Sequence, residues 1–295
     1  MPWIELSVFS RHPQFAEEIL LANGALSVSF RDAADDPQFE PWPGEMPLWK
    51  QTRTVGLFPQ KQSLDATQSS LRELLPDGKS TRLERKRIAD RDWIAASRRK
   101  MRPLRFGRNL WVCPSHRKVR TKNAVVVKLD PGLAFGTGAH PTTALCLAWL
   151  SQQDLHGKTV LDYGCGSGIL AIAALKLGAA RAIGVDLDPQ ALTATMNNAR
   201  ANKVAQRLTV HLPQGFKPEA CDLVIANILA NPLIALAPKL TRCLKPGGAI
   251  ALAGLLKNQA HDIAKAYAPK VKLKTIATRE NWALLSGLRY HARFY

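Results

Sequence analysis

A glycine-rich turn between an apolar run and an apolar helix constrains this chain more than any other stretch. The run ends at Asp162, the turn YGCGSG follows over 163–168, and a helix is expected over 169–177. Such a strand–turn–helix unit gathers backbone N–H groups at a helix N-terminus, where an anionic or polar ligand binds. A second apolar run, 182–185, ends at Asp186, where an acid accepts hydrogen bonds from ribose hydroxyls. The stretch therefore predicts a nucleoside-containing ligand.

Two cofactors fit this turn. The frame Gly166-x-Gly168-x-x-Ala171 satisfies the dinucleotide fingerprint. The alternative frame, Asp162-x-Gly164-x-Gly166-x-Gly168, resembles motif I of class I S-adenosylmethionine-dependent methyltransferases. A carboxylate just before the first glycine suits a cationic amino acid moiety better than a pyrophosphate, so the turn favours the methyl donor.

The second half of the chain alternates between strands and helices. This alternation predicts a doubly wound parallel sheet with helices on both faces. Ligands bind at the carboxyl ends of strands in such sheets, where we expect Asp162, Asp186 and Asn227. Strands are expected over 159–162, 182–186, 208–212, 223–226 and 249–253, and helices over 169–177, 189–201 and 232–243.

The chain finishes with a hairpin, 271–277 and 282–289, around a polar turn. An antiparallel last strand is expected of the class I methyltransferase sheet and not of the standard nicotinamide fold. The hairpin therefore favours the methyl donor independently of the glycine turn.

The first 89 residues predict a small ferredoxin-like α+β domain that recognises the substrate. The expected order is β-α-β-β-α-β. A basic helical linker is expected over 90–104, with its helix ending before Pro103, and a catalytic domain over 105–295. Strands over 106–113 and 124–129 lead into that domain, and Thr142 or Thr143 is expected to cap a helix over 144–150. The domain at the N-terminus has expected strands 3–9, 25–30, 53–58 and 81–88 and helices 12–23 and 64–75.

The net charge of +18 is unevenly distributed. Residues 79–122, here called the basic stretch, hold sixteen Lys and Arg against three acids. One reading is a solvated linker face. The other is a surface for an acidic partner, most naturally ribosomal RNA or a ribosomal particle.

The cysteine pattern and the N-terminus indicate a cytoplasmic protein. The five cysteines include no C-x-x-C pair, which favours reduced thiols over disulfides or zinc. The N-terminus lacks a basic region and a cleavage pattern, and no apolar run is long enough to cross a membrane. We expect no metal site and no membrane contact, and a monomer, because no dimer seam is evident.

The loop around 129–138 carries a more specific resemblance. The sequence LDPGLAFGTG over 129–138, HPTT over 140–143, the glycine turn and Asn-Ile-Leu over 227–229 together resemble the ribosomal protein L11 methyltransferase family. The resemblance implies a small recognition domain, a helical linker and a class I catalytic domain. It implies methyl transfer from S-adenosylmethionine to lysine and/or N-terminal amines of ribosomal protein L11.

The resemblance also assigns the site residues. Thr143, Gly164, Asp186 and Asn227 match the family's donor contacts, and Asp162, Gly166 and Gly168 complete the turn. Phe135 lies in the loop that would cover the donor, and Ala139 replaces the threonine expected before the histidine. Asn227 stands at a strand end beside the donor and is also the candidate catalytic residue. With the backbone carbonyls that follow it, it can accept protons of the amine and aim the lone pair of the amine. The alternative is a structural role in packing the turn.

Two other function classes remain open from the residues. A nicotinamide-dependent oxidoreductase has the fingerprint but gives no account of Asp162, of 227–229 or of the final hairpin. An RNA methyltransferase is supported by the basic stretch and would transfer methyl groups to RNA in place of protein.

Overall fold

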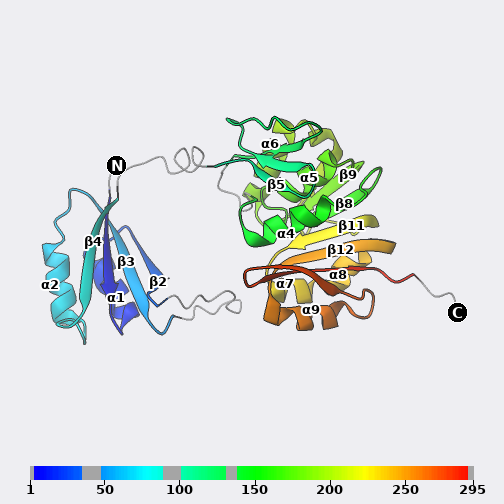
Figure 1. Cartoon of the computed structure of the whole chain (residues 1–295). Coiled ribbons are helices and arrows are strands. Elements are labelled where there is room, and N and C mark those ends of the chain that lie inside the picture. The colour runs from blue at the N-terminus through cyan, green and yellow to red at the C-terminus, as the bar shows by residue number, and fades with distance from the viewer. Residues whose placement is uncertain (1–2, 35–47, 89–100, 131–137, 292–295) are drawn as a thin grey trace. The chain divides into compact units, whose positions relative to one another are not determined.

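The computed structural model describes residues 3–34, 48–88, 101–130 and 138–291. Its contacts divide the chain into two compact units, Met1–Asp92 and Trp93–Tyr295, and both appear in Figure 1. The expected linker helix and the loop over 131–137, including Phe135, lie outside the described residues. Each unit is therefore described by itself.

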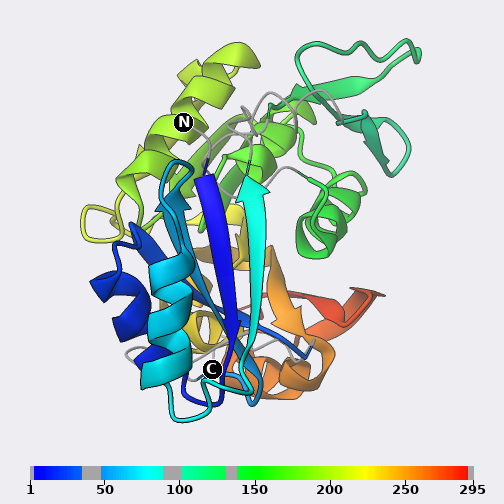
Figure 2. The same cartoon turned by 90° about the vertical axis from the view of Figure 1, so that its left-hand side faces the viewer.

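The N-terminal unit has the order β-α-β-β-α-β, which confirms the ferredoxin-like prediction. Its antiparallel sheet has the strand order β2-β3-β1-β4. Both helices pack on one face of that sheet, as Figure 2 shows. The enclosed core includes Leu6, Leu20, Phe58 and Leu71, all fully buried or nearly so. The elements are β1 (Trp3–Phe9), α1 (Pro13–Ala22), β2 (Ser27–Asp32), β3 (Thr52–Pro59), α2 (Asp65–Leu74) and β4 (Arg82–Ile88).

A small three-stranded sheet opens the described part of the second unit. It contains β5 (Leu104–Phe106), β6 (Leu110–Cys113) and β7 (Val125–Lys128). The single strand expected over 106–113 is wrong: β5 and β6 form an antiparallel hairpin. The chain turns at Gly107, whose φ of +58° favours glycine. β7 then pairs parallel to β6.

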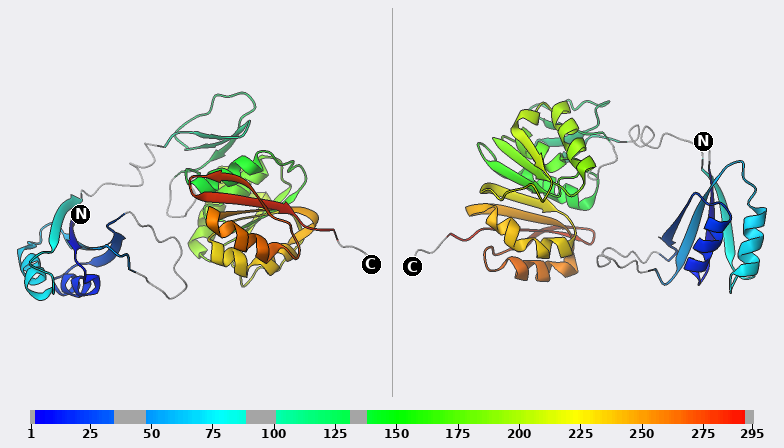
Figure 3. Two further views of the ribbon diagram at one scale, coloured as in Figure 1. Left: turned by 60° about the horizontal axis from the view of Figure 1, so that its bottom comes forward. Right: turned by 180° about the vertical axis from the view of Figure 1, so that it is seen from behind.

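The main sheet has seven strands in the order β10-β9-β8-β11-β12-β14-β13. Strands β10, β9, β8, β11 and β12 run parallel, and β14 runs antiparallel to both β12 and β13. The last hairpin lies beside β12 at one edge of the sheet, as the left panel of Figure 3 shows. The predicted doubly wound sheet with an antiparallel hairpin is confirmed. The strands are β8 (Thr159–Tyr163), β9 (Arg181–Val185), β10 (Leu208–His211), β11 (Cys221–Asn227), β12 (Leu244–Leu256), β13 (Lys274–Arg279) and β14 (Trp282–Leu288).

Helices cover both faces of this sheet, and alternate strand residues point into the two cores. On β8, Val160 belongs to the core with α4 (Pro141–Leu150), α5 (Ile169–Lys176) and α6 (Pro189–Ala201). Its neighbour Leu161 belongs to the core on the opposite face. That second core is closed by α7 (Ala230–Ala235), α8 (Ala237–Arg242) and α9 (Ala260–Tyr267).

Three local predictions in this unit require correction. The helix expected over 232–243 is two short helices, α7 and α8, joined at Leu236. Pro238 is the second residue of α8, where its missing N–H is tolerated but where a continuous helix would lose a hydrogen bond. Helix α9 was not predicted. The turn of the last hairpin is shorter than expected, with Glu280 at a φ of +55°.

The cap of α4 also differs from the expectation. His140, and not Thr142 or Thr143, is the N-cap residue, and its side chain accepts from the backbone N–H of Thr142. Pro141 occupies the first helical position, where its fixed φ favours helix initiation. In the described parts of both units, no helix is both long enough and apolar enough to span a membrane.

Candidate active site

A cavity of about 740 Å³ opens at the carboxyl ends of β8, β9 and β11. These strands flank the point where the strand order reverses, since β8 lies between β9 and β11. Open α/β sheets bind their ligands at such a switch point. The residues that line the cavity include Gly164, Gly166, Asp186, Asn227, Lys239 and Trp282.

The glycine turn forms one wall of this cavity. The N–H of Gly164 donates to the carbonyl of Val185 at 2.7 Å, which ties the end of β8 to the end of β9. Gly164 has a φ of +80°, and a Cβ at this position would lie 2.2 Å from Cγ2 of Ile228. Only glycine fits both the conformation and the space.

Asp186 lies at the wall of the cavity, directly after β9. Its carboxylate accepts from the N–H of Gly166 at 2.8 Å and from the N–H of Asp188 at 3.1 Å. Both bonds fix the carboxylate at the cavity wall. The next residue, Leu187, also lines the cavity and is 77% exposed. A carboxylate beside an exposed apolar side chain suits a ribose with an attached base.

Asn227 and Thr143 come together although they are 84 residues apart. The Nδ2 of Asn227 donates to Oγ1 of Thr143 at 3.2 Å. Thr143 is buried in the first turn of α4, and Asn227 lines the cavity at the end of β11. With its nitrogen engaged by Thr143, the amide of Asn227 presents its carbonyl oxygen as an acceptor. Thr143 itself does not line the cavity.

Asp162 occupies a different environment from the other predicted site residues. It is fully buried, does not line the cavity, and its Oδ2 accepts from the N–H of Ala171 in α5 at 3.0 Å. Its Oδ1 is buried with no hydrogen-bond partner. Burial, with a smaller contribution from the charge of Asp186, raises the pKa of the Asp162 carboxyl to about 7.

This raised pKa predicts a pH-dependent stability in the donor-free protein. Between about pH 4 and pH 7 the folded chain keeps a proton on Asp162 that the unfolded chain releases. The free energy of unfolding therefore falls as the pH rises through this window, and the contribution is constant above it. The free energy of unfolding of Asp162→Asn minus that of the parent should rise by about 2–3 kcal/mol between about pH 5 and pH 8. Denaturant titrations at several pH values measure this difference, and a constant difference would contradict the raised pKa.

Two features of the cavity were missed in the sequence. The Nζ of Lys239 lies 3.4 Å from Oη of Tyr163 and 3.3 Å from the carbonyl of Pro213, and it stands over the ring of Phe216 at 5.6 Å. No pattern in the sequence singled out this lysine, because the helix expected over 232–243 was assigned no part in the site.

The other missed feature is an aromatic pair. Trp282 packs edge-on against His140 with ring centroids 5.2 Å apart. Trp282 begins β14, so the last hairpin contributes directly to the cavity. The position of a tryptophan just after the hairpin turn was the signal available in the sequence.

The cavity combines a carboxylate, backbone amides, an oriented amide and a largely apolar wall. Such a set can bind a nucleoside and hold a second molecule against it. Among the described residues, no group of three or more His, Cys, Asp and Glu side chains is placed to hold a metal ion.

Comparisons with known proteins identify the family. The family model described as ribosomal protein L11 methyltransferase matches residues 2–289. The proteins named ribosomal protein L11 methyltransferase from Photorhabdus laumondii and Erwinia tasmaniensis are 47% and 49% identical to this chain. The first match covers 98% of this chain and 99% of that protein, and the second covers 98% and 100%.

This chain is also similar to a solved structure of a protein with the same name. The ribosomal protein L11 methylase from Lactobacillus delbrueckii subsp. bulgaricus is 31% identical, with a TM-score of 0.59. The match covers 65% of this chain and 100% of that one. The match over 2–289 spans both units, including the glycine turn, Asp186 and Asn227. This chain therefore belongs to the ribosomal protein L11 methyltransferase family.

Proposed function

We propose that this methyltransferase transfers methyl groups from S-adenosylmethionine to lysine and/or N-terminal amines of ribosomal protein L11. The observation that carries the proposal is the convergence of Asp186 and Asn227 on one cavity at the switch point. The carboxylate of Asp186 is suited to a nucleoside, and the amide of Asn227 is suited to an amine. Membership of the family supports the choice of substrate.

The residues of the cavity fit the donor. Asp186 would hold the ribose hydroxyls, and Leu187 would cover the base. Gly164 and Gly166 leave the backbone open to close approach, since neither carries a Cβ. Asp162 would support this wall from within, through its bond to the N–H of Ala171. When bound, the donor supplies a methyl group already activated on a sulfonium.

The chain must present the acceptor amine in its neutral form. A free lysine has a pKa of about 10.4. The apolar wall of the cavity and the positive charge of Lys239 both disfavour a second cation there and would lower that pKa. The carbonyl oxygen of Asn227 then accepts an N–H of the amine and aims its lone pair. Alignment of this kind accounts for up to ~7–11 kcal/mol in well-oriented reactions.

The orientation of Asn227 depends on Thr143, which gives a direct prediction. Thr143→Val keeps the shape of the side chain but removes the acceptor for Nδ2 of Asn227. We expect kcat to fall about five- to tenfold, which is the value of one neutral hydrogen bond, with donor Kd unchanged. Steady-state kinetics and calorimetric titration measure the two quantities. Thr241→Val is the matched control for loss of a buried hydroxyl, because Thr241 bonds only to carbonyls within α8 and does not line this cavity.

We further propose roles for the parts of the chain outside the cavity. The segment 1–89 recognises the substrate, 90–104 is a basic helical linker, and 105–295 carries out the transfer. The family match over both units supports this division. The enzyme acts as a monomer in the cytoplasm. A molar mass near 65 kDa by light scattering, about twice the 32.4 kDa of one chain, would contradict the monomer.

The basic stretch, residues 79–122, is proposed to contact ribosomal RNA. Its described cations are mostly exposed, and Arg105 stands 5.9 Å from the ring of Trp111. The variant Arg117→Ala/Lys118→Ala/Arg120→Ala should elute from immobilised ribosomal RNA at lower salt than the parent. Unchanged elution would leave this stretch as a solvated face.

The experiment that tests the main proposal is intact-mass spectrometry of unmethylated ribosomal protein L11 incubated with the enzyme and S-adenosylmethionine. Methyl-sized mass steps on the protein are expected, and none with Asp186→Ala. An equal amount of ribosomal RNA is incubated in parallel. Methyl incorporation into RNA without mass steps on the protein would overturn the substrate and favour the RNA methyltransferase.

A further inference from the structure

Two adjoining cavities lie at the hairpin edge of the second unit, away from the candidate active site. One has a volume of about 400 Å³ and the other about 1070 Å³, and both are lined by Pro269, Lys270 and Arg289. Neither shares a lining residue with the active-site cavity. The two cavities, which share these three residues, are here called the basic groove. Its basic side chains are Arg242, Lys270, Lys272, Lys274, Arg289 and His291.

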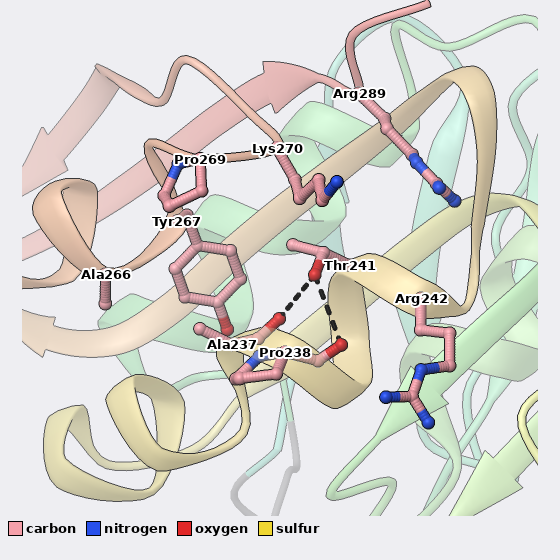
Figure 4. Close-up of a pocket in the computed structure, with 9 residues that line it drawn as sticks. All are labelled: Ala237, Pro238, Thr241, Arg242, Ala266, Tyr267, Pro269, Lys270 and Arg289. Carbon is pink, nitrogen blue, oxygen red and sulfur yellow. Dashed lines mark hydrogen bonds between the residues drawn. The ribbon is translucent and has the colours of Figure 1, made fainter. Parts of the chain in front are cut away.

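The polar groups of the groove floor are satisfied within the protein. Figure 4 shows the hydroxyl of Thr241 bonded to backbone carbonyls of α8, the shorter bond being 2.7 Å to Ala237. The buried Tyr267 donates its hydroxyl to the carbonyl of Leu233 at 2.9 Å. In the same view, cationic side chains surround the cavity from α8, from the segment after α9 and from the end of the last strand. These cations, and not the floor, are therefore the groups that can meet a ligand.

Among the residues that the structure describes, cations outnumber acids around the groove. No acidic side chain in the described parts of the chain lines either cavity. Arg289 donates to the backbone carbonyl of Leu244 and not to a carboxylate. The acids on the nearby strand β11 and before it pair elsewhere, Asp222 with Lys245 at 2.8 Å and Glu219 with Arg181 at 2.5 Å. A cluster of unpaired cations repels itself and attracts an anionic partner.

The lysines form a row on one exposed face. Lys270, Lys272 and Lys274 are exposed, whereas the intervening Val271 and Leu273 are buried. The row runs from the turn after α9, which contains Lys270, to the first residue of β13, Lys274. This row suits a chain of successive charges better than a single small anion.

Backbone hydrogen bonds connect the start of the row to the sheet. The N–H of Tyr290 donates to the carbonyl of Lys270 at 2.9 Å, and the N–H of Arg289 donates to the carbonyl of Gly248 at 2.9 Å. These backbone bonds join the lysine segment to β14 and to the start of β12. A ligand would therefore meet cations whose backbone is already ordered.

Exposed apolar surface lies among these charges. Leu288 is 61% exposed and Tyr290 is 49% exposed, and both line the larger cavity. Surfaces that bind single-stranded nucleic acid combine a positive groove with aromatic rings on which bases stack. An acidic peptide would use the lysines but would have no need of the ring of Tyr290.

We propose that the basic groove binds the phosphate backbone of single-stranded RNA, with Tyr290 as a stacking face for a base. The choice of RNA over DNA rests on the proposed ribosomal substrate. The groove itself rests only on its own residues and is separate from the basic stretch.

The test is fluorescence anisotropy of a short labelled oligouridylate with the full-length protein over a range of KCl concentrations. The variant Lys270→Ala/Lys272→Ala/Lys274→Ala removes the row. The matched control, Lys176→Ala/Arg200→Ala/Lys203→Asn, removes the same net charge from the α5 and α6 side of the sheet. Asparagine is chosen at 203 because Lys203 has a φ of +59°, which asparagine tolerates.

We expect the row variant to bind RNA about tenfold or more weakly and to lose about 2 from the slope of log affinity against log salt, at about 0.7 per phosphate contact. The control should stay within about twofold. Tyr290→Ala should weaken binding about fivefold without changing the slope. All variants should keep the donor affinity of the parent, which shows that they are folded.

Several results would overturn the proposal. These are equal losses of RNA affinity in the row and control variants, no RNA binding by the parent, or tighter binding of DNA of the same sequence. Polyglutamate is titrated in parallel. A row variant that loses affinity for polyglutamate but not for RNA would mark a peptide surface. Binding that survives in the row variant but is lost in Arg117→Ala/Lys118→Ala/Arg120→Ala would assign the contact to the basic stretch. Methylation of ribosomal protein L11 is measured on the same samples. Groove binding without methylation would contradict the proposed function alone.

Discussion

Asp186→Ala is expected to weaken binding of S-adenosylmethionine about 100-fold or more. The substitution removes an acceptor for two ribose hydroxyls, and each hydrogen bond to a charged group contributes about 1.5–3 kcal/mol. It also removes the carboxylate that holds the N–H of Gly166 at 2.8 Å, so the glycine turn loses its fixed geometry. Isothermal titration with the donor and with its demethylated product measures the loss.

The neighbouring acid provides the control. Asp188 caps α6 by accepting from the N–H of Gln190 at 2.8 Å and does not line the cavity. Asp188→Ala should lower the free energy of unfolding by about 1 kcal/mol and leave donor Kd unchanged. Similar donor affinities for the two variants would contradict the ribose role of Asp186.

Asn227→Ala is expected to lower kcat about 100-fold while donor Kd changes less than about threefold. The amide oxygen is proposed to aim the amine, and misalignment of a reacting group by about 1 Å costs this much in rate. Rapid-quench measurement of a single turnover separates the transfer step from product release. The two constants should therefore respond very differently.

The isosteric Asn227→Asp separates aiming from charge. It keeps an oxygen toward the amine but adds an acid, so it should retain more activity than alanine at low pH, where the carboxyl is protonated. A kcat for Asn227→Ala equal to that of the parent would contradict the catalytic role. Equal losses in kcat and donor affinity would instead indicate that Asn227 only supports the donor site.

The sequence predicted the second unit well where the periodicity of the apolar residues and the positions of the turn-forming residues agree. Strands β8, β9 and β11 alternate between two cores, and the sequence alone places Asp162, Asp186 and Asn227 at their carboxyl ends. The ferredoxin-like order of the first unit was predictable because alternating strand patterns there are separated by helices that end at glycine or proline. The C-terminal hairpin was predicted because a polar turn separates two segments rich in strand-forming residues.

The failures have physical causes. A proline in the first turn of a helix looks the same in sequence as a proline inside one, so the break between α7 and α8 at Leu236 was missed. The hairpin at Gly107 was hidden because both of its strands are short. The cap of α4 was assigned to threonine by propensity, but the ring nitrogen of His140 performs it.

Sequence alone also could not separate two kinds of acid at strand ends. Asp162 and Asp186 both follow apolar runs, yet one is sealed behind the glycine turn and the other forms the cavity wall. The difference depends on α5, whose first turn covers Asp162. Lys239 and Trp282 reach the cavity from elements distant in the chain, and no local spacing marks such residues.

Ile228 lies against two glycines, one in the turn after β8 and the other in β12. A Cβ at Gly164 would meet its side chain at 2.2 Å, whereas a Cβ at Gly254 would meet its carbonyl oxygen at 2.3 Å. Trimming Ile228 to alanine would open space beside Gly164 but none beside Gly254, since a backbone atom is present whatever the residue. A side chain at either position would also sit on a left-handed backbone, with a φ of +80° at 164 and +86° at 254. Both positions are therefore held as glycine for as long as the backbone around Ile228 keeps its course.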